Sequence, residues 1–196
     1  MKLTSSKIIS ILHKNFPYLS NDDIDSFLKI TTYSKVDKKE ILIEKGNQPK
    51  QIFFILSGYV RGYITNELGL EKIILLRDKG YFIGDAEKIF YDRPQKYTYA
   101  TIKESHVLFL NYDNLESLAF NNPLIMRLLL NIFKEIMTAQ NHRIESLISM
   151  DATNRYEELI EKKPGFLKEI HSKFLANFIG ITPVSLSRIQ KKISSQ

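Results

Sequence analysis

Short apolar runs separated by turn residues fill the stretch from Glu40 to Leu110. Gly, Asn, Asp and Pro mark the turns between them, for example at Gly46 and at Pro94. The runs predicted to be strands are 40–44, 52–56, 60–64, 72–76, 97–102 and 107–110. Several short strands within about 70 residues predict a compact β-barrel or sandwich.

Helical periodicity lies on both sides of this β-rich stretch. Two short helices are predicted ahead of the strands, at 6–16 and 21–30. Ser20 and Asp23 form a capping-box pattern at the start of the second helix. After the strands, Pro123 opens the longest predicted helix, which runs to about Met150.

The long predicted helix carries a seven-residue repeat, in which Leu130, Met137 and Ile144 belong to one series. The full seam consists of Leu130, Phe133, Met137, Gln140, Ile144 and Leu147. Such a seam is typical of a helix that pairs with its own copy. The alternative is packing onto the β-domain, a contact that Ile125 and Leu128 also offer. Since the apolar arc is wide enough for both contacts, we expect a homodimer.

The stretch from Phe174 to Ile189 has the pattern of a helix-turn-helix. A short apolar helix ends near Gly180, which tolerates the positive φ that a tight turn requires. Thr182 is then a candidate N-cap, and Pro183 is the first residue of a second helix. The positions expected to face the core are Leu175, Ile179, Leu186 and Ile189.

The opposite face of the second predicted helix suits contact with DNA. Arg188 has the planar fork that binds guanine, and Val184 is suited to a thymine methyl group. The residues expected to contact DNA are Ser172, Lys173, Val184, Ser185, Ser187, Arg188, Lys191 and Lys192. The alternative is a solvated basic hairpin of two helices.

Charge supports a polyanionic partner at this end of the chain. The 196 residues have a formal net charge of +6, and the last 26 hold four Lys or Arg and no Asp or Glu. A basic end on a nearly neutral body favours double-stranded DNA as the partner. The length suits one domain with a large core and a second, smaller one.

The sequence also excludes several classes of protein. It has no Cys, which excludes disulfides and Cys-ligated zinc or iron–sulfur sites, and its four His show no metal-ligand spacing. We therefore expect no metal. No apolar run approaches the ~18 residues of a membrane span, and no secretory segment is evident, so a cytoplasmic protein without a membrane partner is expected.

Four local motifs follow one another in a characteristic order: Ile52–Arg61, Gly80–Asp85, Arg155–Leu159 and Gly180–Ile189. Together with the order of the predicted elements, they resemble the Crp/Fnr family of transcription regulators over nearly the whole chain. The resemblance implies a regulator that binds a palindromic DNA site as a homodimer, with RNA polymerase as a further candidate partner.

The resemblance also implies the architecture. It is an α+β chain with a double-stranded β-helix (jelly-roll-like) sensor barrel of the cyclic-nucleotide-binding type at 1–118. A long dimerisation helix follows at 119–150, and an all-α helix-turn-helix domain at 151–196. The rival is a cupin-type enzyme, which shares the barrel but needs several His ligands; only His106 falls in this one. No catalytic motif is evident, so we expect no enzymatic activity.

The family's phosphate cassette normally contains Gly-Glu-Leu and, about ten residues later, Arg-Ser or Arg-Thr. The matching residues here are Gly84, Asp85, Ala86, Lys96 and Tyr97. Asp85 is one methylene shorter than Glu, Lys96 replaces the planar fork by a point charge, and Tyr97 places a ring where phosphate needs room. We therefore expect no cofactor and a pocket that does not bind cyclic AMP.

Four alternatives for this regulator and its pocket stay open. The first is a regulator that responds to cyclic AMP through a variant cassette, and the second is a regulator that acts mainly through protein contacts. The third is a pocket that holds another ligand, and the fourth is a pocket filled by its own side chains, for which Tyr81, Phe82, Tyr97 and Tyr99 are suited. For Asp85 and Lys96, the alternative to a ligand role is a surface ion pair near the barrel mouth.

Overall fold

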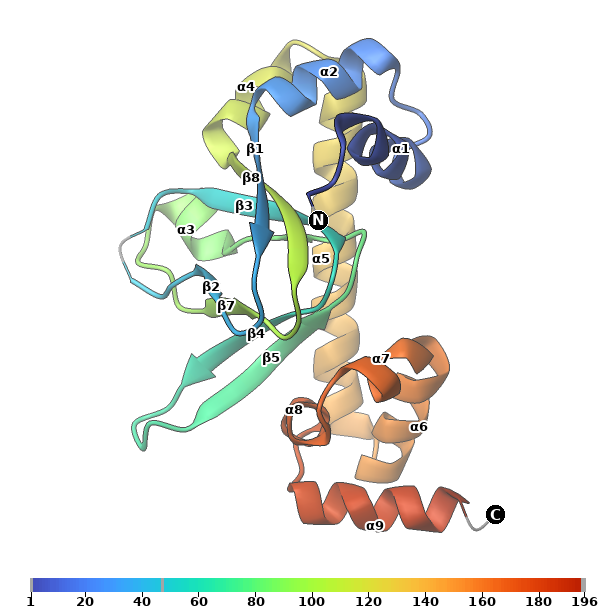
Figure 1. Cartoon of the computed structure of the whole chain (residues 1–196). Coiled ribbons are helices and arrows are strands. Elements are labelled where there is room, and N and C mark those ends of the chain that lie inside the picture. The colour runs from blue at the N-terminus through green and yellow to red at the C-terminus, as the bar shows by residue number, and fades with distance from the viewer. Residues whose placement is uncertain (1, 47, 195–196) are drawn as a thin grey trace. The chain divides into compact units, whose positions relative to one another are not determined.

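The computed structural model of the protein describes residues 2–46 and 48–194 (Figure 1). Its strands are β1 (Thr31–Val36), β2 (Ile41–Ile43), β3 (Gln51–Ser57), β4 (Val60–Thr65), β5 (Glu71–Arg77), β6 (Phe82–Ile83), β7 (Thr98–Thr101) and β8 (Ser105–Asn111). They form two four-stranded sheets, with the orders β1-β8-β3-β6 and β2-β7-β4-β5. This arrangement confirms the jelly-roll-like barrel expected from the sequence.

Strand β3 is buried on both faces, because its two sets of side chains enter different parts of the core. Phe53 points toward the second sheet, with its ring 6.1 Å from Tyr99, and it also lies 5.7 Å from Phe109 on β8. Phe54 points the other way and packs 5.5 Å from Phe16, which follows the first helix. A strand covered on both faces requires the continuous apolar run that its sequence shows.

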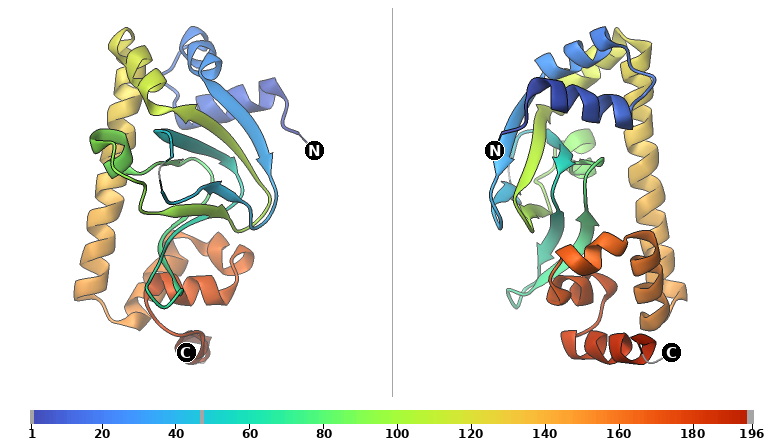
Figure 2. Two further views of the ribbon diagram at one scale, coloured as in Figure 1. Left: turned by 90° about the vertical axis from the view of Figure 1, so that its left-hand side faces the viewer. Right: turned by 45° about the vertical axis from the view of Figure 1, so that its right-hand side comes forward.

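Helices α1 (Ser5–Asn15), α2 (Asn21–Lys29) and α4 (Tyr112–Phe120) lie together beside β1 and β8 (Figure 2). The predicted capping box is confirmed at the start of α2. Ser20 Oγ accepts from Asp23 N at 3.2 Å, and Asp23 Oδ2 accepts from Ser20 N at 2.9 Å. Asn122 donates to the other oxygen of Asp23 at 2.5 Å, which ties α2 to the residue before the long helix.

The remaining helices are α3 (Ala86–Tyr91), α5 (Pro123–Ser149), α6 (Ala152–Lys162), α7 (Pro164–Glu169), α8 (Ser172–Ile179) and α9 (Pro183–Ser194). The long helix therefore begins at the predicted proline. None of the helices in the two described ranges, 2–46 and 48–194, has both the length and the apolar character needed to cross a membrane.

The chain forms two compact units. The first contains the residues up to Gly62 and Leu76–Glu135, and the second contains Tyr63–Leu75 and the residues from Ile136 onward. The tip of the β4–β5 hairpin thus belongs to the same unit as helices α6 to α9. This division differs from the boundaries after residues 118 and 150 that the resemblance implies, and those boundaries stay a prediction.

The sequence pattern missed two strands and several short helices. Strand β1 was missed because Val36 is its one buried position and the rest of it is polar or half-exposed. Strand β6 contains only Phe82 and Ile83, which is too short for a periodicity to be recognised. Helix α3 has six residues and therefore less than two full turns.

Replacing Ser20 by Ala should lower the free energy of unfolding by about 1 kcal/mol, the typical cost of removing an N-cap hydroxyl. Urea denaturation at neutral pH measures this loss. The hydrogen bond from Ser20 is the main cause that lowers the pKa of Asp23 below 3.8.

Urea denaturation at lower pH tests whether the pKa of Asp23 is lowered in the folded protein. A lowered folded-state pKa contributes stability that is complete above 3.8 and is lost as the pH falls through the folded pKa. The difference between wild type and Ser20→Ala should therefore shrink upon acidification below that value. A difference that grows there would contradict the role given to the capping box.

Candidate nucleic-acid interface and sensor pocket

The turn between α8 and α9 has the geometry that the sequence predicts. Gly180 ends α8 with a φ of +82°, in the left-handed region that favours glycine. Its N–H bonds back to the carbonyl of Asn177 at 3.1 Å, and Ile181 N–H bonds to the carbonyl of Ala176 at 2.9 Å. Thr182 Oγ1 then accepts from the backbone N–H of the third helical residue at 3.1 Å, which starts α9.

The expected core positions anchor this turn. Leu175, Ile179 and Leu186 are each no more than 1% exposed, whereas Ile189 is half-buried. Because these side chains face inward, the remaining face of α9 is turned to the outside.

The residues expected to contact DNA all lie at least partly on the surface. The exposed ones are Ser172, Lys173, Val184, Ser187, Arg188, Lys191 and Lys192. Ser185 is half-buried, and its Oγ lies 3.0 Å from Thr182 Oγ1. The Ser185 hydroxyl thus has a partner within the turn, while Ser187, two residues further along α9, is exposed.

Two arginines hold the C-terminal end of α8. Arg155 on α6 donates from Nε to the carbonyl of Ile179 at 2.9 Å and from a terminal nitrogen to the carbonyl of Met150 at 2.5 Å. Arg143 on α5 donates to the carbonyl of Phe178 and stacks over its ring at 4.2 Å. Burial and, after it, the charge of Arg155 lower the pKa of Arg143 to about 10. Cations at this position also complement the negative end of the helix dipole.

Sequence reasoning did not identify this pair of arginines as a support of the turn. Arg155 was noticed only as part of a family motif, and Arg143 stands among polar residues on a long helix. Their partners are backbone carbonyls, which carry no residue-specific signal in a sequence.

In the barrel, Asp85 is the N-cap of α3 and is only 2% exposed. One carboxylate oxygen accepts from Glu87 N at 2.9 Å and from Lys88 N at 3.4 Å. The other accepts from Lys96 N at 2.9 Å. Three backbone amides in and next to the expected phosphate cassette are thus directed at an anion that belongs to the protein itself.

The side chain of Lys96 does not pair with Asp85 as the ion-pair alternative supposed. Its ammonium instead contacts the carboxylate of Glu87, and Arg93 lies 3.7 Å from the second oxygen of that carboxylate. The hydrogen bond from Lys96 lowers the pKa of Glu87, and the same bond raises the pKa of Lys96. The alternative was wrong because Asp85 lies inside the turn and only the longer Glu87 reaches the surface.

Aromatic side chains pack beside this cassette. Tyr99 is 3% exposed and donates its hydroxyl to the carbonyl of Gly84 at 3.2 Å. Burial raises the pKa of Tyr99, so the hydroxyl stays protonated and able to donate. Tyr97 packs edge-on against it, with the ring centroids 6.4 Å apart. A Cβ added to Gly84 would lie 2.5 Å from the side chain of Ile52, so this wall is closely packed.

The two apolar sets of α5 have different environments. Ile125 and Leu128 are fully buried, while the seam residues Leu130, Met137 and Ile144 are between 56% and 63% exposed. Of the other seam positions, Leu147 and Gln140 are exposed. Phe133 is half-buried, with its ring 5.1 Å from that of Phe90 on α3. Most of the seam is therefore left open in the single chain.

His106, the barrel histidine, is part of a hydrogen-bond network and not of a metal cluster. Its Nδ1 lies 2.6 Å from the hydroxyl of Tyr33, which also accepts from the backbone N–H of Leu3 at 2.9 Å. Across the described ranges, no three His, Asp or Glu side chains are grouped so that they could hold a metal ion.

Comparison with known proteins finds a matching family model and similar transcription regulators. The family model "Cyclic nucleotide-binding domain" matches residues 33–122. The cAMP-activated global transcriptional regulators CRP of Salmonella typhimurium and of Klebsiella aerogenes are each 22% identical over 184 residues, which cover 88% of this chain and 87% of the relative.

Solved structures share the fold at lower identity. A CooA mutant from Carboxydothermus hydrogenoformans has a TM-score of 0.74 and 16% identity, covering 99% of this chain and 87% of that chain. A putative transcriptional regulator of the Crp/Fnr family from Eubacterium rectale has a TM-score of 0.69 and 15% identity, covering 93% and 88% of the two chains.

Replacing Arg155 by Ala should destabilise the protein by about 2 kcal/mol or more, because two carbonyl groups lose a charged donor. Thermal unfolding of the purified variant measures the effect. Arg155→Lys is the matched control, since it keeps the charge but loses the planar fork, and it should fall between wild type and Arg155→Ala. Equal stability of all three proteins would show that the guanidinium does not hold the turn.

Proposed function

We propose that this chain is a transcription regulator of the Crp/Fnr family and that it controls transcription by binding double-stranded DNA through α9. The observation that carries the proposal is the exposed polar and cationic face of α9, presented by a turn whose apolar residues are buried. A helix held at such a turn can enter the major groove with one face.

The side chains on this face divide into two roles. Arg188 is exposed and can donate to O6 and N7 of a guanine, while Val184, 63% exposed, can meet a thymine methyl group. Lys191, Lys192 and the exposed Lys173 at the start of α8 would neutralise phosphates. For the polar contact next to Arg188 we favour Ser187, because it is exposed, whereas Ser185 is half-buried and has a hydroxyl partner within the turn.

The open seam of α5 supports a homodimer. Its exposed apolar residues have the spacing with which two parallel helices pack knobs into holes. A symmetric dimer would present two copies of α9 and so match a palindromic site with half-sites about one helical turn apart.

The hydrogen bonds within the barrel support a sensor domain that does not bind cyclic AMP. The amides of Glu87, Lys88 and Lys96 are bonded to Asp85, and the Lys96 ammonium contacts Glu87. A cyclic phosphate would have to displace the buried Asp85 carboxylate, and leaving that anion buried without its donors would be costly. The relatives named cAMP-activated are thus expected to differ from this chain in their effector.

Selection of binding sites from a random duplex pool tests the role of α9. Wild type should enrich a palindrome, whereas Arg188→Ala should lose preference at one base of each half-site and bind about 1–3 kcal/mol more weakly. Lys191→Ala should weaken binding to all duplexes alike. It should also reduce the slope of log affinity against log salt concentration by about one. If Arg188→Ala kept its full base preference, Arg188 would not contact a base.

The same selection with and without cyclic AMP tests the barrel. We expect the same palindrome in both arms. Enrichment only with the nucleotide would contradict a closed pocket, and no enrichment in either arm would favour a regulator that acts through protein contacts.

Replacing Met137 by Glu should produce monomers in sedimentation velocity, because two carboxylates would face each other across the seam. The variant should also lose most of its affinity for the palindromic site. Thr138→Glu is the matched control: it introduces the same charge at the next residue of α5, which is exposed and lies outside the seam, and it should stay dimeric. A dimeric Met137→Glu protein would place the interface elsewhere.

A further inference from the structure

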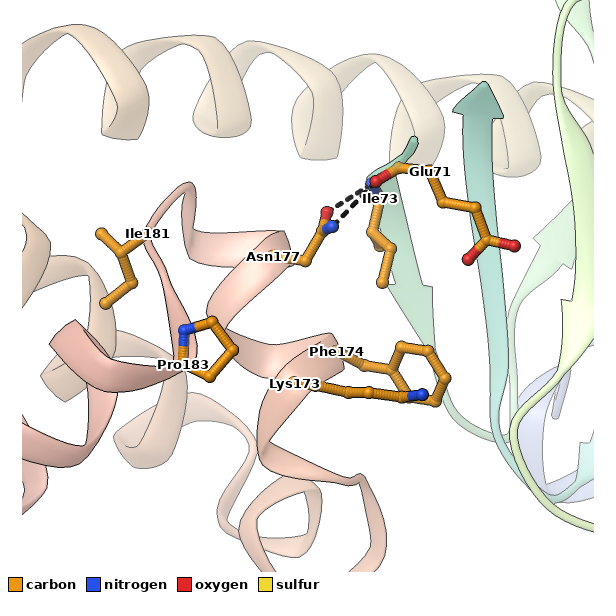
Figure 3. A pocket seen from close by; sticks show the side chains of 7 residues that line it. All are labelled: Glu71, Ile73, Lys173, Phe174, Asn177, Ile181 and Pro183. Carbon is orange, nitrogen blue, oxygen red and sulfur yellow. Dashed lines mark hydrogen bonds between the residues drawn. The ribbon is translucent and has the colours of Figure 1, made fainter. Parts of the chain in front are cut away.

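The side chain of Asn177 on α8 bonds to the backbone of β5 through both of its polar atoms (Figure 3). Its Oδ1 accepts from Ile73 N at 2.7 Å, and its Nδ2 donates to the carbonyl of Glu71 at 2.9 Å. All three residues belong to the second compact unit. A carboxamide carries the same donor and acceptor as a peptide group, so Asn177 pairs with this strand as a neighbouring strand would.

Strand β5 is suited to such a contact because it stands at the end of the sheet order β2-β7-β4-β5. An edge strand presents N–H and C=O groups that have no partner within the sheet. We call this pair of hydrogen bonds, between Asn177 and the backbone of Ile73 and Glu71, the Asn177 latch. Of the twenty amino acids, only Asn and Gln have a carboxamide side chain, which holds a donor nitrogen and an acceptor oxygen in one planar group as a peptide does.

A pocket of about 270 Å³ lies beside the latch (Figure 3). It is lined by Glu71, Ile73, Lys173, Phe174, Asn177, Ile181 and Pro183. Residues of β5 and of both helices of the helix-turn-helix therefore line the same pocket. Ile73 is only 4% exposed, so its side chain is also covered.

The latch lies at the surface that the proposed function gives to DNA. Lys173 is expected to contact a phosphate, and Pro183 is the first residue of α9, yet both share their pocket with Glu71. A phosphate that approaches Lys173 would therefore come near a hairpin that carries the negative charge of Glu71, and like charges repel. Contact between the hairpin and α8 would thus disfavour the closest approach of the DNA backbone.

We propose that the Asn177 latch is an autoinhibitory contact, which holds the β4–β5 hairpin against α8 and competes with DNA for the helix-turn-helix. The inference rests on the proposed function of α9. Two neutral hydrogen bonds of ordinary net strength bias such an equilibrium by on the order of ten-fold, which is enough to regulate binding without preventing it.

The test compares wild type with Asn177→Ala. Alanine removes both bonds and favours the helical conformation of α8, so the variant should fold. We expect it to bind the selected duplex up to about ten-fold more tightly, as measured by fluorescence anisotropy. Affinity equal to or weaker than that of wild type would overturn the proposal, since the contact would then be neutral or would assist DNA binding.

Two further variants act as controls. Asn154→Ala makes the same substitution at an exposed position of α6 in the same unit and should leave the affinity unchanged. Glu71→Gln keeps the backbone carbonyl that Asn177 binds but removes the charge, so it should increase the affinity by less than Asn177→Ala. If Glu71→Gln had the full effect, charge repulsion and not the latch would be responsible.

Hydrogen exchange at the Ile73 amide separates this inference from the proposed function. Asn177→Ala should accelerate this exchange with no DNA present, because the amide loses its acceptor. Adding the selected duplex to wild type should also accelerate it, since coupling between two sites is reciprocal. Tight DNA binding without faster exchange would overturn the latch alone. Failure of every variant to bind any duplex would overturn the proposed function and, with it, competition by the latch.

Discussion

The C-terminal end of α8 is the constraint on which the proposed DNA-binding surface depends. Gly180 turns the chain in a conformation that other residues adopt only with strain, and Arg143 and Arg155 bind the carbonyl groups just before it. These bonds fix where α8 stops and so the direction in which α9 leaves. Without them, the exposed side chains of α9 would have no defined geometry toward a groove.

Different faces of helix α5 have different roles. Its first half buries Ile125 and Leu128, its outer stripe leaves Leu130 and Met137 exposed, and Arg143 near its end supports α8. One continuous helix therefore connects core packing, the proposed dimer contact and the support of the turn.

The barrel shows how a cyclic-nucleotide-binding-type domain can satisfy its polar groups with its own residues. The amides that begin α3 have Asp85 as their anion, and Tyr99 supplies a hydrogen bond to the carbonyl of Gly84. Since buried polar groups must be paired, these bonds satisfy the polar groups of the cassette within the chain itself.

The sequence by itself determined the features that depend on local pattern. The six predicted strands, the capping box at Ser20, the long helix from Pro123 and the turn at Gly180 all follow from periodicity and from the conformational preferences of single residues. The apolar seam of α5 was visible for the same reason, because helical spacing separates a second stripe from the buried one.

Only the tertiary structure decided which polar groups meet. Asp85 and Lys96 looked like an ion pair from their positions, yet the carboxylate binds backbone amides and the ammonium contacts Glu87. Asn177 and Ile73 are 104 residues apart, and nothing in the sequence near either of them indicates a contact. Bonds to the backbone can be made with any residue type, so sequence pattern cannot reveal them; they follow from the packing of elements that are distant in the chain.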